Sequence, residues 1–340
     1  MADSDRNHVV PLDRIREARE LVAARVRRTP LLISETGARA IRTSSGVAIA
    51  DDCLYVKAEN LQKTGSFKPR GMTWRVATLT PEQRAKGIVT LSAGNAGQAY
   101  AWAARALGTH ATVVMPAAAV RSKVDACVGY GAEVVLHGAH VGETFVEMER
   151  LREERGLTLT HPFDDPEVIA GNGTLGLELL DELPEVDVVV VPVGGGGLIS
   201  GVAAALKESR PGVRVFGVEP RRSNALSLAI ERGEVVRIEP QSVADGLGAP
   251  FAGTWTLAMG RRYLDGIVLL DDPTILGGLR FAAERMKQVL EPAGAAALAA
   301  VIYGRVPLRD GDRVAVVASG GNVEIGRLGE LLAAAAPLPI

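Results

Sequence analysis

The chain has 340 residues, of which 47% are hydrophobic, and its formal net charge is −2. This length allows two domains of ordinary size or one large domain with a substantial core. The balanced charge gives no electrostatic reason to expect nucleic acid or an anionic membrane as a partner, and no apolar run approaches the roughly 18 residues that a membrane helix needs.

Cysteine is rare in this chain: Cys53 and Cys127 both lie in or beside apolar segments. Such use is typical of buried thiols in a reducing compartment rather than of a disulfide scaffold. The first residues, Met1 to Arg6, contain no basic stretch followed by an apolar run, so we expect no secretory signal. We therefore predict a soluble, cytoplasmic, globular protein.

Short runs of β-branched residues alternate with longer alanine- and leucine-rich segments. The short runs predict strands, and the longer segments have helical spacing. This alternation is typical of α/β units on a mostly parallel sheet. In chain order we expect helix 12–26, strand 54–58, helix 70–79, strand 88–91, helix 96–107, strand 111–115, helix 121–130, strand 133–136, helix 141–155, helix 174–183, strand 186–193, helix 198–208, strand 214–218, helix 225–231, strand 267–270, helices 273–290 and 294–303, and strand 313–318.

The predicted strands also suggest a division into domains. Those that begin near residues 88, 111 and 133 follow one another at similar intervals, so we expect residues 88–163 to form a small, mobile α/β domain. Residues 1–87 and 164–340 would then form the larger domain. The run Val188 to Val191 is apolar throughout, as expected when helices cover both faces of a sheet.

One lysine stands in an unusual setting. Lys68 follows an aromatic residue and a Thr-Gly-Ser turn, and a helical pattern begins two residues later. A lysine at such a junction projects over whatever binds there, and its amine can condense with an aldehyde. It can equally be an ordinary solvated residue at a helix start, so Lys68 alone does not decide the function.

Four glycines, Gly194 to Gly197, follow the most apolar predicted strand and precede a helical pattern that begins at Leu198. They let the backbone approach a ligand closely, with N–H groups and a helix N-terminus directed at it. This arrangement predicts an anion site, most naturally for phosphate. It is not a P-loop because no Gly-Lys-Ser/Thr follows, but a dinucleotide-binding turn or a simple tight turn stays open.

Two more predicted strands end in small polar turns. Ser92-Ala93-Gly94-Asn95-Ala96 follows the first, and its backbone amides can bind a carboxylate while Asn95 bonds a ring hydroxyl. An ordinary N-cap by Ser92 or Asn95 would explain the same residues. Ser319 follows the last strand, at the edge where open α/β sheets bind ligands, although a lone serine there is more often a cap.

Taken in order, the motifs Ser-Phe-Lys, Ser-Ala-Gly-Asn, Gly-Gly-Gly-Gly-Leu and Ser-Gly-Gly-Asn resemble those of pyridoxal-phosphate enzymes of the tryptophan-synthase β type, fold type II. Residues 243–247 and 291–295 also resemble the threonine/serine dehydratase and serine racemase branch of that family. The resemblance runs from about Val10 to Gly326. It implies two open, twisted, mostly parallel sheets flanked by helices, with pyridoxal 5′-phosphate as cofactor.

The resemblance also implies roles for individual residues. Lys68 would form the Schiff base with the cofactor and later handle the Cα proton, and Phe67 would pack against the ring. Asn95 would bond the ring hydroxyl O3′, and Ser319 would face the pyridine nitrogen. The phosphate would be held by Gly194, Gly195, Gly196, Gly197 and Leu198, and the substrate carboxylate by Ser92, Ala93, Gly94, Asn95 and Ala96.

The reaction that follows is an elimination. A carboxylate at the pyridine nitrogen would keep it protonated and make the ring a strong electron sink, and the neutral Ser319 does not. We therefore expect β-elimination rather than transamination. The implied function is dehydration of L-threonine or a related β-hydroxy amino acid to a 2-oxo acid and ammonia.

This chain departs from the racemase-like members at several positions. Those members have a motif like Ser-Ser-Gly-Asn-His at this turn, and its second serine acts as an acid on the ring face opposite the lysine. In this chain Ala93 occupies the position of that serine. Ala96 replaces the histidine, which leaves room for a bulkier hydroxyamino acid. A divalent-cation site would begin at a residue like Glu219, but its second carboxylate falls at Ala225, so we expect no required metal.

Several alternatives stay open. The substrate could be another hydroxyamino acid, such as hydroxyaspartate, phenylserine or a hydroxyectoine-derived compound, or the enzyme could racemise serine or catalyse β-replacement. A nucleotide-binding regulatory protein that uses the turn 194–197 is the alternative from another class. We expect an amino acid as the small-molecule partner, with neither nucleic acid nor membrane, and a homodimer or homotetramer, as is common in the family.

Overall fold

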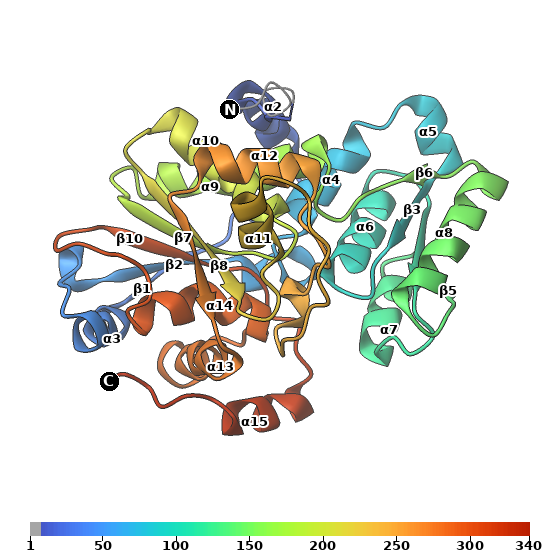
Figure 1. Cartoon of the computed structure of the whole chain (residues 1–340). Coiled ribbons are helices and arrows are strands. Elements are labelled where there is room, and N and C mark those ends of the chain that lie inside the picture. The colour runs from blue at the N-terminus through green and yellow to red at the C-terminus, as the bar shows by residue number, and fades with distance from the viewer. Residues whose placement is uncertain (1–7) are drawn as a thin grey trace.

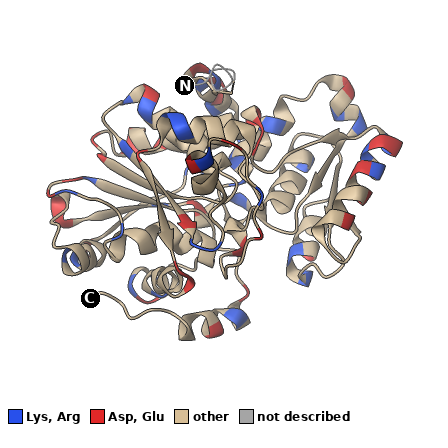
Figure 2. Ribbon diagram, viewed as in Figure 1, with Lys and Arg blue, Asp and Glu red and all other residues tan. Residues whose placement is uncertain are grey.

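The computed structural model describes residues 8–340 and contains two open, mostly parallel sheets flanked by helices (Figure 1). The predicted fold class is thereby confirmed. Residues 1–7, on which the expectation of no secretory signal depends, lie outside the described residues. Within residues 8–340, none of the helices combines the length and the apolar character needed to cross a bilayer. Figure 2 shows acidic and basic residues interspersed along the outer helices of both sheets.

The larger sheet has six strands in the order β1-β2-β10-β7-β8-β9. Neighbouring strands are parallel except for β1 and β2, which are antiparallel. The last strand of the chain therefore lies in the middle of the sheet, beside one of the first. The strands are β1 (Leu31–Ser34), β2 (Leu54–Ala58), β7 (Val188–Pro192), β8 (Arg214–Pro220), β9 (Gly266–Leu270) and β10 (Val314–Ala318).

Helices cover both faces of this sheet, as the apolar strands predicted. Alternate side chains of β7 point to opposite faces, so that Val189 and Val191 belong to one buried cluster and Val188 and Val190 to another. The first cluster includes residues of α2 (Leu12–Ala23), α9 (Pro166–Glu182), α10 (Gly197–Ser209), α11 (Ala225–Arg232) and α12 (Thr254–Tyr263). The second includes residues of α3 (Glu35–Ser45), α13 (Asp272–Phe281), α14 (Pro292–Ile302) and α15 (Ile325–Ala333).

The smaller sheet has four parallel strands in the order β5-β4-β3-β6. They are β3 (Ile88–Leu91), β4 (Ala111–Met115), β5 (Glu133–Leu136) and β6 (Thr158–Leu159). Residues of α4 (Pro69–Ala77), α6 (Asn95–Ala106) and α7 (Arg121–Gly129) pack on one face, and α8 (Val141–Arg155) packs on the other; α5 (Pro81–Lys86) precedes β3. All four strands fall within 88–163, and the mobility of that segment as a domain stays a prediction.

Two expected helices differ from the structure. The helix expected at 174–183 begins at Pro166, because its glycines belong to a closely packed helix and not to a loop. A Cβ on Gly171 would lie 2.6 Å from the carbonyl oxygen of Arg70 in α4, and one on Gly201 in α10 would lie 2.2 Å from that of Ile169. The helix expected at 273–290 ends at Phe281 and continues as a single π-helical stretch, Ala282–Met286.

Two buried cations hold the start of α4 in place. Arg70 is 1% exposed and donates to both carboxylate oxygens of Glu59 at 2.8 Å and to Glu178 at 2.9 Å. Lys57 in β2 is fully buried and pairs at 2.7 Å with Glu178 and with Glu182 in α9. Buried charges need such partners, so this network joins α4, β2 and α9 into one unit.

Candidate active site

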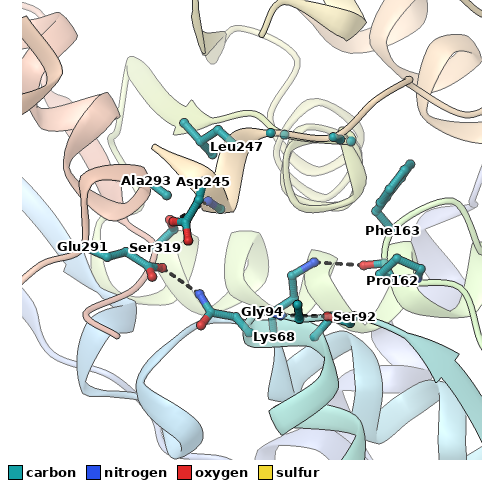
Figure 3. A pocket seen from close by; sticks show the side chains of 18 of the residues that line it. Lys68, Ser92, Gly94, Pro162, Phe163, Asp245, Leu247, Glu291, Ala293 and Ser319 are labelled. Carbon is teal, nitrogen blue, oxygen red and sulfur yellow. Dashed lines mark hydrogen bonds between the residues drawn. The ribbon is translucent and has the colours of Figure 1, made fainter. Parts of the chain in front are cut away.

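A cavity of about 520 Å³ lies where the residues that follow β3, β4, β7 and β10 meet. This is the carboxyl edge of both sheets, where open α/β folds bind ligands. Figure 3 shows Asp245, Glu291 and Ser319 on one side of the cavity and Pro162 and Phe163 on the other. Every residue that the sequence selected lines this cavity: Phe67, Lys68, Ser92, Ala93, Gly94, Asn95, Ala96, Gly194, Gly195, Gly196, Gly197, Leu198 and Ser319.

Lys68 occupies the N-cap position of α4, directly before Pro69. Proline suits the first helical position because its missing N–H would have no partner there. The lysine amine reaches across the cavity and donates to the carbonyl oxygen of Pro162 at 2.9 Å (Figure 3). Burial lowers the pKa of Lys68 to about 8, although the charge of Glu291 opposes this shift. The amine is therefore closer to its neutral, nucleophilic form than an exposed lysine is at the same pH.

The loop before Lys68 is attached to the turn after β10. The N–H of Phe67 donates to the carbonyl oxygen of Ser319 at 3.0 Å, and Asn322 Nδ2 donates to the carbonyl oxygen of Thr64 at 2.8 Å. Thr64 has a φ of 58°, a left-handed conformation that a residue branched at Cβ rarely adopts. These bonds hold the strained loop and bring Lys68 and Ser319 to the same cavity.

Asn95 begins α6, and both polar atoms of its side chain have protein partners. Its Nδ2 donates to Oε1 of Glu291 at 2.6 Å, and its Oδ1 accepts from Nδ2 of Asn322 at 2.8 Å. Glu291 is 5% exposed, and burial raises its pKa to about 7 while the bond from Asn95 opposes that rise. A ring hydroxyl that approached Asn95 would have to share or replace the bond to Glu291.

The turn 92–96 is organised by a serine. Ser92 Oγ accepts from the backbone N–H groups of Gly94 at 3.2 Å and Gly97 at 3.1 Å. Gly94 occupies the N-cap position of α6, so an N-cap by Asn95 is wrong, whereas the hydroxyl of Ser92 caps the helix from two residues earlier by accepting from Gly97. The N-terminus of α6 is directed at the cavity, where its dipole favours an anion.

The glycine turn 194–197 allows the segment around Phe163 to approach closely. A Cβ on Gly195 would lie 2.4 Å from the Phe163 ring, and one on Gly197 would lie 2.6 Å from the Phe163 carbonyl oxygen. Gly196 has a φ of 90° and marks the start of α10. Larger residues would collide with these neighbours, so this packing requires glycine, and the turn brings backbone N–H groups to the N-terminus of α10, where an anion such as phosphate can bind.

Comparison with known proteins decides the family. The model of the family described as "Pyridoxal-phosphate dependent enzyme" matches residues 22–320. The chain belongs to this family. The enzyme is 39% identical over 325 residues to a protein named L-threonine ammonia-lyase from Thermotoga maritima, covering 95% of this chain and 78% of that one. It is 41% identical over 318 residues to a putative threonine dehydratase from Sinorhizobium fredii, covering 93% of each chain.

Solved structures agree in fold. Maize serine racemase superimposes with a TM-score of 0.88 at 34% identity, covering 95% of the enzyme and 96% of the racemase. The processed form of threonine deaminase isoform 2 from Solanum lycopersicum has a TM-score of 0.86 at 32% identity, covering 96% and 94%. The enzyme therefore has the fold type II architecture and uses pyridoxal phosphate.

The described residues fit this cofactor. Lys68 offers an amine of lowered pKa for the aldehyde, and the turn 194–197 at the start of α10 offers backbone donors for the phosphate. Ser319 is 4% exposed and lines the same cavity without a charge.

Four further residues belong to the cavity. Asp245 and Glu291 lie in the segments 243–247 and 291–295 that resemble the family but had no role assigned, and Lys123 and Phe163 were not selected from the sequence. Lys123 in α7 pairs with Asp245 at 2.8 Å, and both line the cavity with Glu291 and Phe163. The local sequence could have indicated Glu291 as a site residue, because this acid directly precedes an apolar helix. No local pattern indicates Lys123 or Phe163, since only the fold brings them to the cavity.

Glu219, at the end of β8, does not resemble a cation ligand in this structure. Its two carboxylate oxygens accept from the N–H groups of Leu226 at 2.8 Å and Ser227 at 3.0 Å. Within residues 8–340, no group of three His, Cys, Asp or Glu side chains is placed to hold a metal ion. The expectation that no metal is required stays a prediction.

Proposed function

We propose that the enzyme is an ammonia-lyase that dehydrates L-threonine or a related β-hydroxy amino acid to a 2-oxo acid and ammonia. The observation that carries this proposal is the meeting of Lys68, Ser319 and the turn 194–197 at one cavity. The names of the threonine ammonia-lyase and threonine dehydratase relatives support the same reaction.

We assign the cofactor contacts as follows. Lys68 binds the aldehyde, Phe67 packs against the ring, and Ser319 faces the pyridine nitrogen. Asn95 lies within reach of the ring hydroxyl once its bond to Glu291 is shared. The phosphate lies against the turn that consists of Gly194, Gly195, Gly196, Gly197 and Leu198.

The remaining turn binds the substrate. We assign the substrate carboxylate to the turn of Ser92, Ala93, Gly94, Asn95 and Ala96 at the start of α6. The N–H of Ser92 donates to the carbonyl oxygen of Val114 and that of Gly94 to Ser92 Oγ, so the donors to the carboxylate would come from the rest of the turn. A substrate carboxylate there would leave its Cα near the amine of Lys68. Ala93 has no proton to donate on the other face, which favours elimination over racemisation.

When bound, pyridoxal phosphate captures the amino group and withdraws electrons from Cα. The amine of Lys68 removes the Cα proton, and the Cβ–O bond breaks as the hydroxyl leaves with a proton as water. The amine of Lys68 would then displace the nitrogen of the unsaturated product from the cofactor aldehyde. Tautomerisation of the released enamine to an imine and hydrolysis by one water give the 2-oxo acid and ammonium. For threonine the net reaction releases 2-oxobutanoate and ammonium and consumes no water.

Replacing the lysine tests this proposal. In Lys68→Ala the visible absorption band of the lysine Schiff base should disappear, because the attacking amine is gone. The rate of 2-oxobutanoate release from L-threonine should fall by at least about a thousandfold. Lys86→Ala is the matched control, since Lys86 is exposed at the end of α5. A purified protein that stays colourless with added cofactor, or a Lys68→Ala variant with full activity, would contradict the proposal.

We also propose a homodimer or homotetramer, a cytoplasmic location, and movement of residues 88–163 as a small domain. The separation of the strands into two sheets supports the last proposal. Sedimentation analysis of the holoenzyme measures the oligomeric state. A change in small-angle scattering on addition of a non-reactive amino acid measures the movement of residues 88–163.

A further inference from the structure

We propose that the site selects β-hydroxy amino acids whose β-substituent is uncharged, apolar and larger than the methyl group of threonine, and that it discriminates against a β-carboxylate. This inference rests on the proposed function, because it concerns the substrate of that same cavity. It depends on the wall of the cavity that follows β4.

The topology places this wall beside the turn that we assign to the substrate carboxylate. β3 and β4 are adjacent and parallel, with Leu91 opposite Val114, so the segments that follow them leave the sheet at the same edge. Ala118, Ala119 and Val120 line the same cavity as Ala93 and Ala96. A substrate held by its carboxylate at the first segment therefore has its side chain within reach of the second.

The wall is small and apolar. Four of these five side chains are single methyl groups, which leave volume for a substituent, and Val120 is 44% exposed. Phe163 and Leu247 face the cavity from other sides (Figure 3). Covering such surfaces with an apolar substituent removes them from water, whereas a methyl group or a hydrogen atom covers less of them.

The charges in the cavity disfavour an anionic substituent. Among the described residues that line it, the only cations are Lys68, which the cofactor takes, and Lys123. The Lys123 amine is bound to Asp245 at 2.8 Å, and Glu291 lies on the same side of the cavity. A β-carboxylate would thus meet two acids and no free cation, and like charges in a confined site repel.

A substrate panel on the holoenzyme tests this inference. We expect kcat/KM for L-3-hydroxynorvaline and L-threo-3-phenylserine to exceed the value for L-threonine, and that for L-threo-3-hydroxyaspartate to be at least about a hundredfold lower than the value for L-threonine. If hydroxyaspartate is used as well as threonine, or if both larger substrates are used less well than threonine, the inference is wrong.

Two variants locate the cause. Ala119→Leu should lower kcat/KM for phenylserine at least about tenfold more than that for serine. Ala117→Leu is the matched control, because Ala117 is exposed in the same segment and does not line the cavity. Asp245→Asn should raise the ratio of hydroxyaspartate to threonine turnover about tenfold by releasing Lys123. Unchanged ratios in both variants would assign the selection to another wall.

Binding without turnover separates this inference from the proposed function. If no hydroxyamino acid releases a 2-oxo acid, the proposed function fails. Calorimetric titration of the holoenzyme with L-norvaline, L-phenylalanine and L-aspartate then tests the cavity alone. Tighter binding of the two apolar amino acids supports the inference, and tighter binding of aspartate overturns it.

Discussion

The side-chain amide of Asn95 donates a 2.6 Å hydrogen bond to the buried carboxyl group of Glu291. Asn95 opens α6, which packs on the smaller sheet, and Glu291 directly precedes α14, which packs on the larger one. The bond therefore joins the two halves of the structure beside the cavity. It also holds a carboxyl group near enough to influence the charge of Lys68.

Removing the negative charge of Glu291 should shift the pH at which the enzyme takes up its cofactor. Only the neutral amine condenses with an aldehyde, so reconstitution of the apoenzyme should accelerate as the pH rises through about 8, the pKa of Lys68. The negative charge of Glu291 raises the pKa of Lys68, so Glu291→Gln should move this midpoint to lower pH. The measurement is the rate at which visible absorption develops at each pH.

Glu153→Gln provides the control, because Glu153 is 76% exposed on α8. Its midpoint should equal that of the unmodified enzyme. A Glu291→Gln midpoint that stays in place or moves to higher pH would show that the carboxyl group has no such influence.

Breaking the buried network behind Lys68 should unfold the enzyme more easily. Arg70→Met removes the partner of two buried carboxylates, Glu59 and Glu178, and should lower the free energy of unfolding by about 3–5 kcal/mol. Urea denaturation followed by circular dichroism measures the free energy of unfolding and the midpoint of the transition. Arg150→Met is the comparison, since its pairs on α8 are exposed and the midpoint should hardly change. Equal midpoints for the two variants would refute the role of the network.

Adding a methyl group to the glycine turn should weaken cofactor binding. In Gly196→Ala the new Cβ would lie 2.8 Å from Thr256, at a φ of 90° that alanine adopts only with strain. A strain of about 1–2 kcal/mol would raise the dissociation constant of pyridoxal phosphate roughly tenfold. Equilibrium dialysis measures it. Gly212→Ala has open space and no such φ, so its dissociation constant should be unchanged.

Chelators should leave activity almost unchanged. Both oxygens of Glu219 already accept backbone hydrogen bonds, and Ala225 supplies no second ligand. We expect kcat/KM for L-threonine to change less than about twofold on dialysis against EDTA or on addition of Mg²⁺ or Ca²⁺. A larger loss that added cation restores would establish a metal site that this interpretation excludes.

Local patterns predicted the centre of the fold well. The expected strands at 54–58, 88–91, 111–115 and 133–136 have the observed bounds, because each is a short β-branched run between turns. Sequence reasoning selected Lys68 and the glycine turn 194–197 for a similar reason: their unusual composition is concentrated in a few consecutive residues. All of them line one cavity, and their roles stay proposals.

Features that depend on distant packing were missed. The strands β1 and β6 and the helices α3, α5, α12 and α15 were not expected. The helices α3 and α15 have a clear amphipathic pattern, which sequence reasoning overlooked. The first turns of α9, which include Gly171, were not expected to be helical, and this glycine lies inside the helix because the backbones of α4 and α9 touch there. The pair between Lys123 and Asp245 joins residues 122 positions apart, so no local signal could indicate it.

The position of β10 also determines the order in which the site can be assembled during synthesis. β2, which leads to Lys68, has β1 and β10 as its neighbours in the sheet, and β10 ends at Ala318. The smaller sheet uses only residues 88–159, so a ribosome can complete it early. Lys68 and Ser319 come together only when almost the whole chain has emerged, so a prematurely terminated chain cannot form the cavity that we assign to the cofactor.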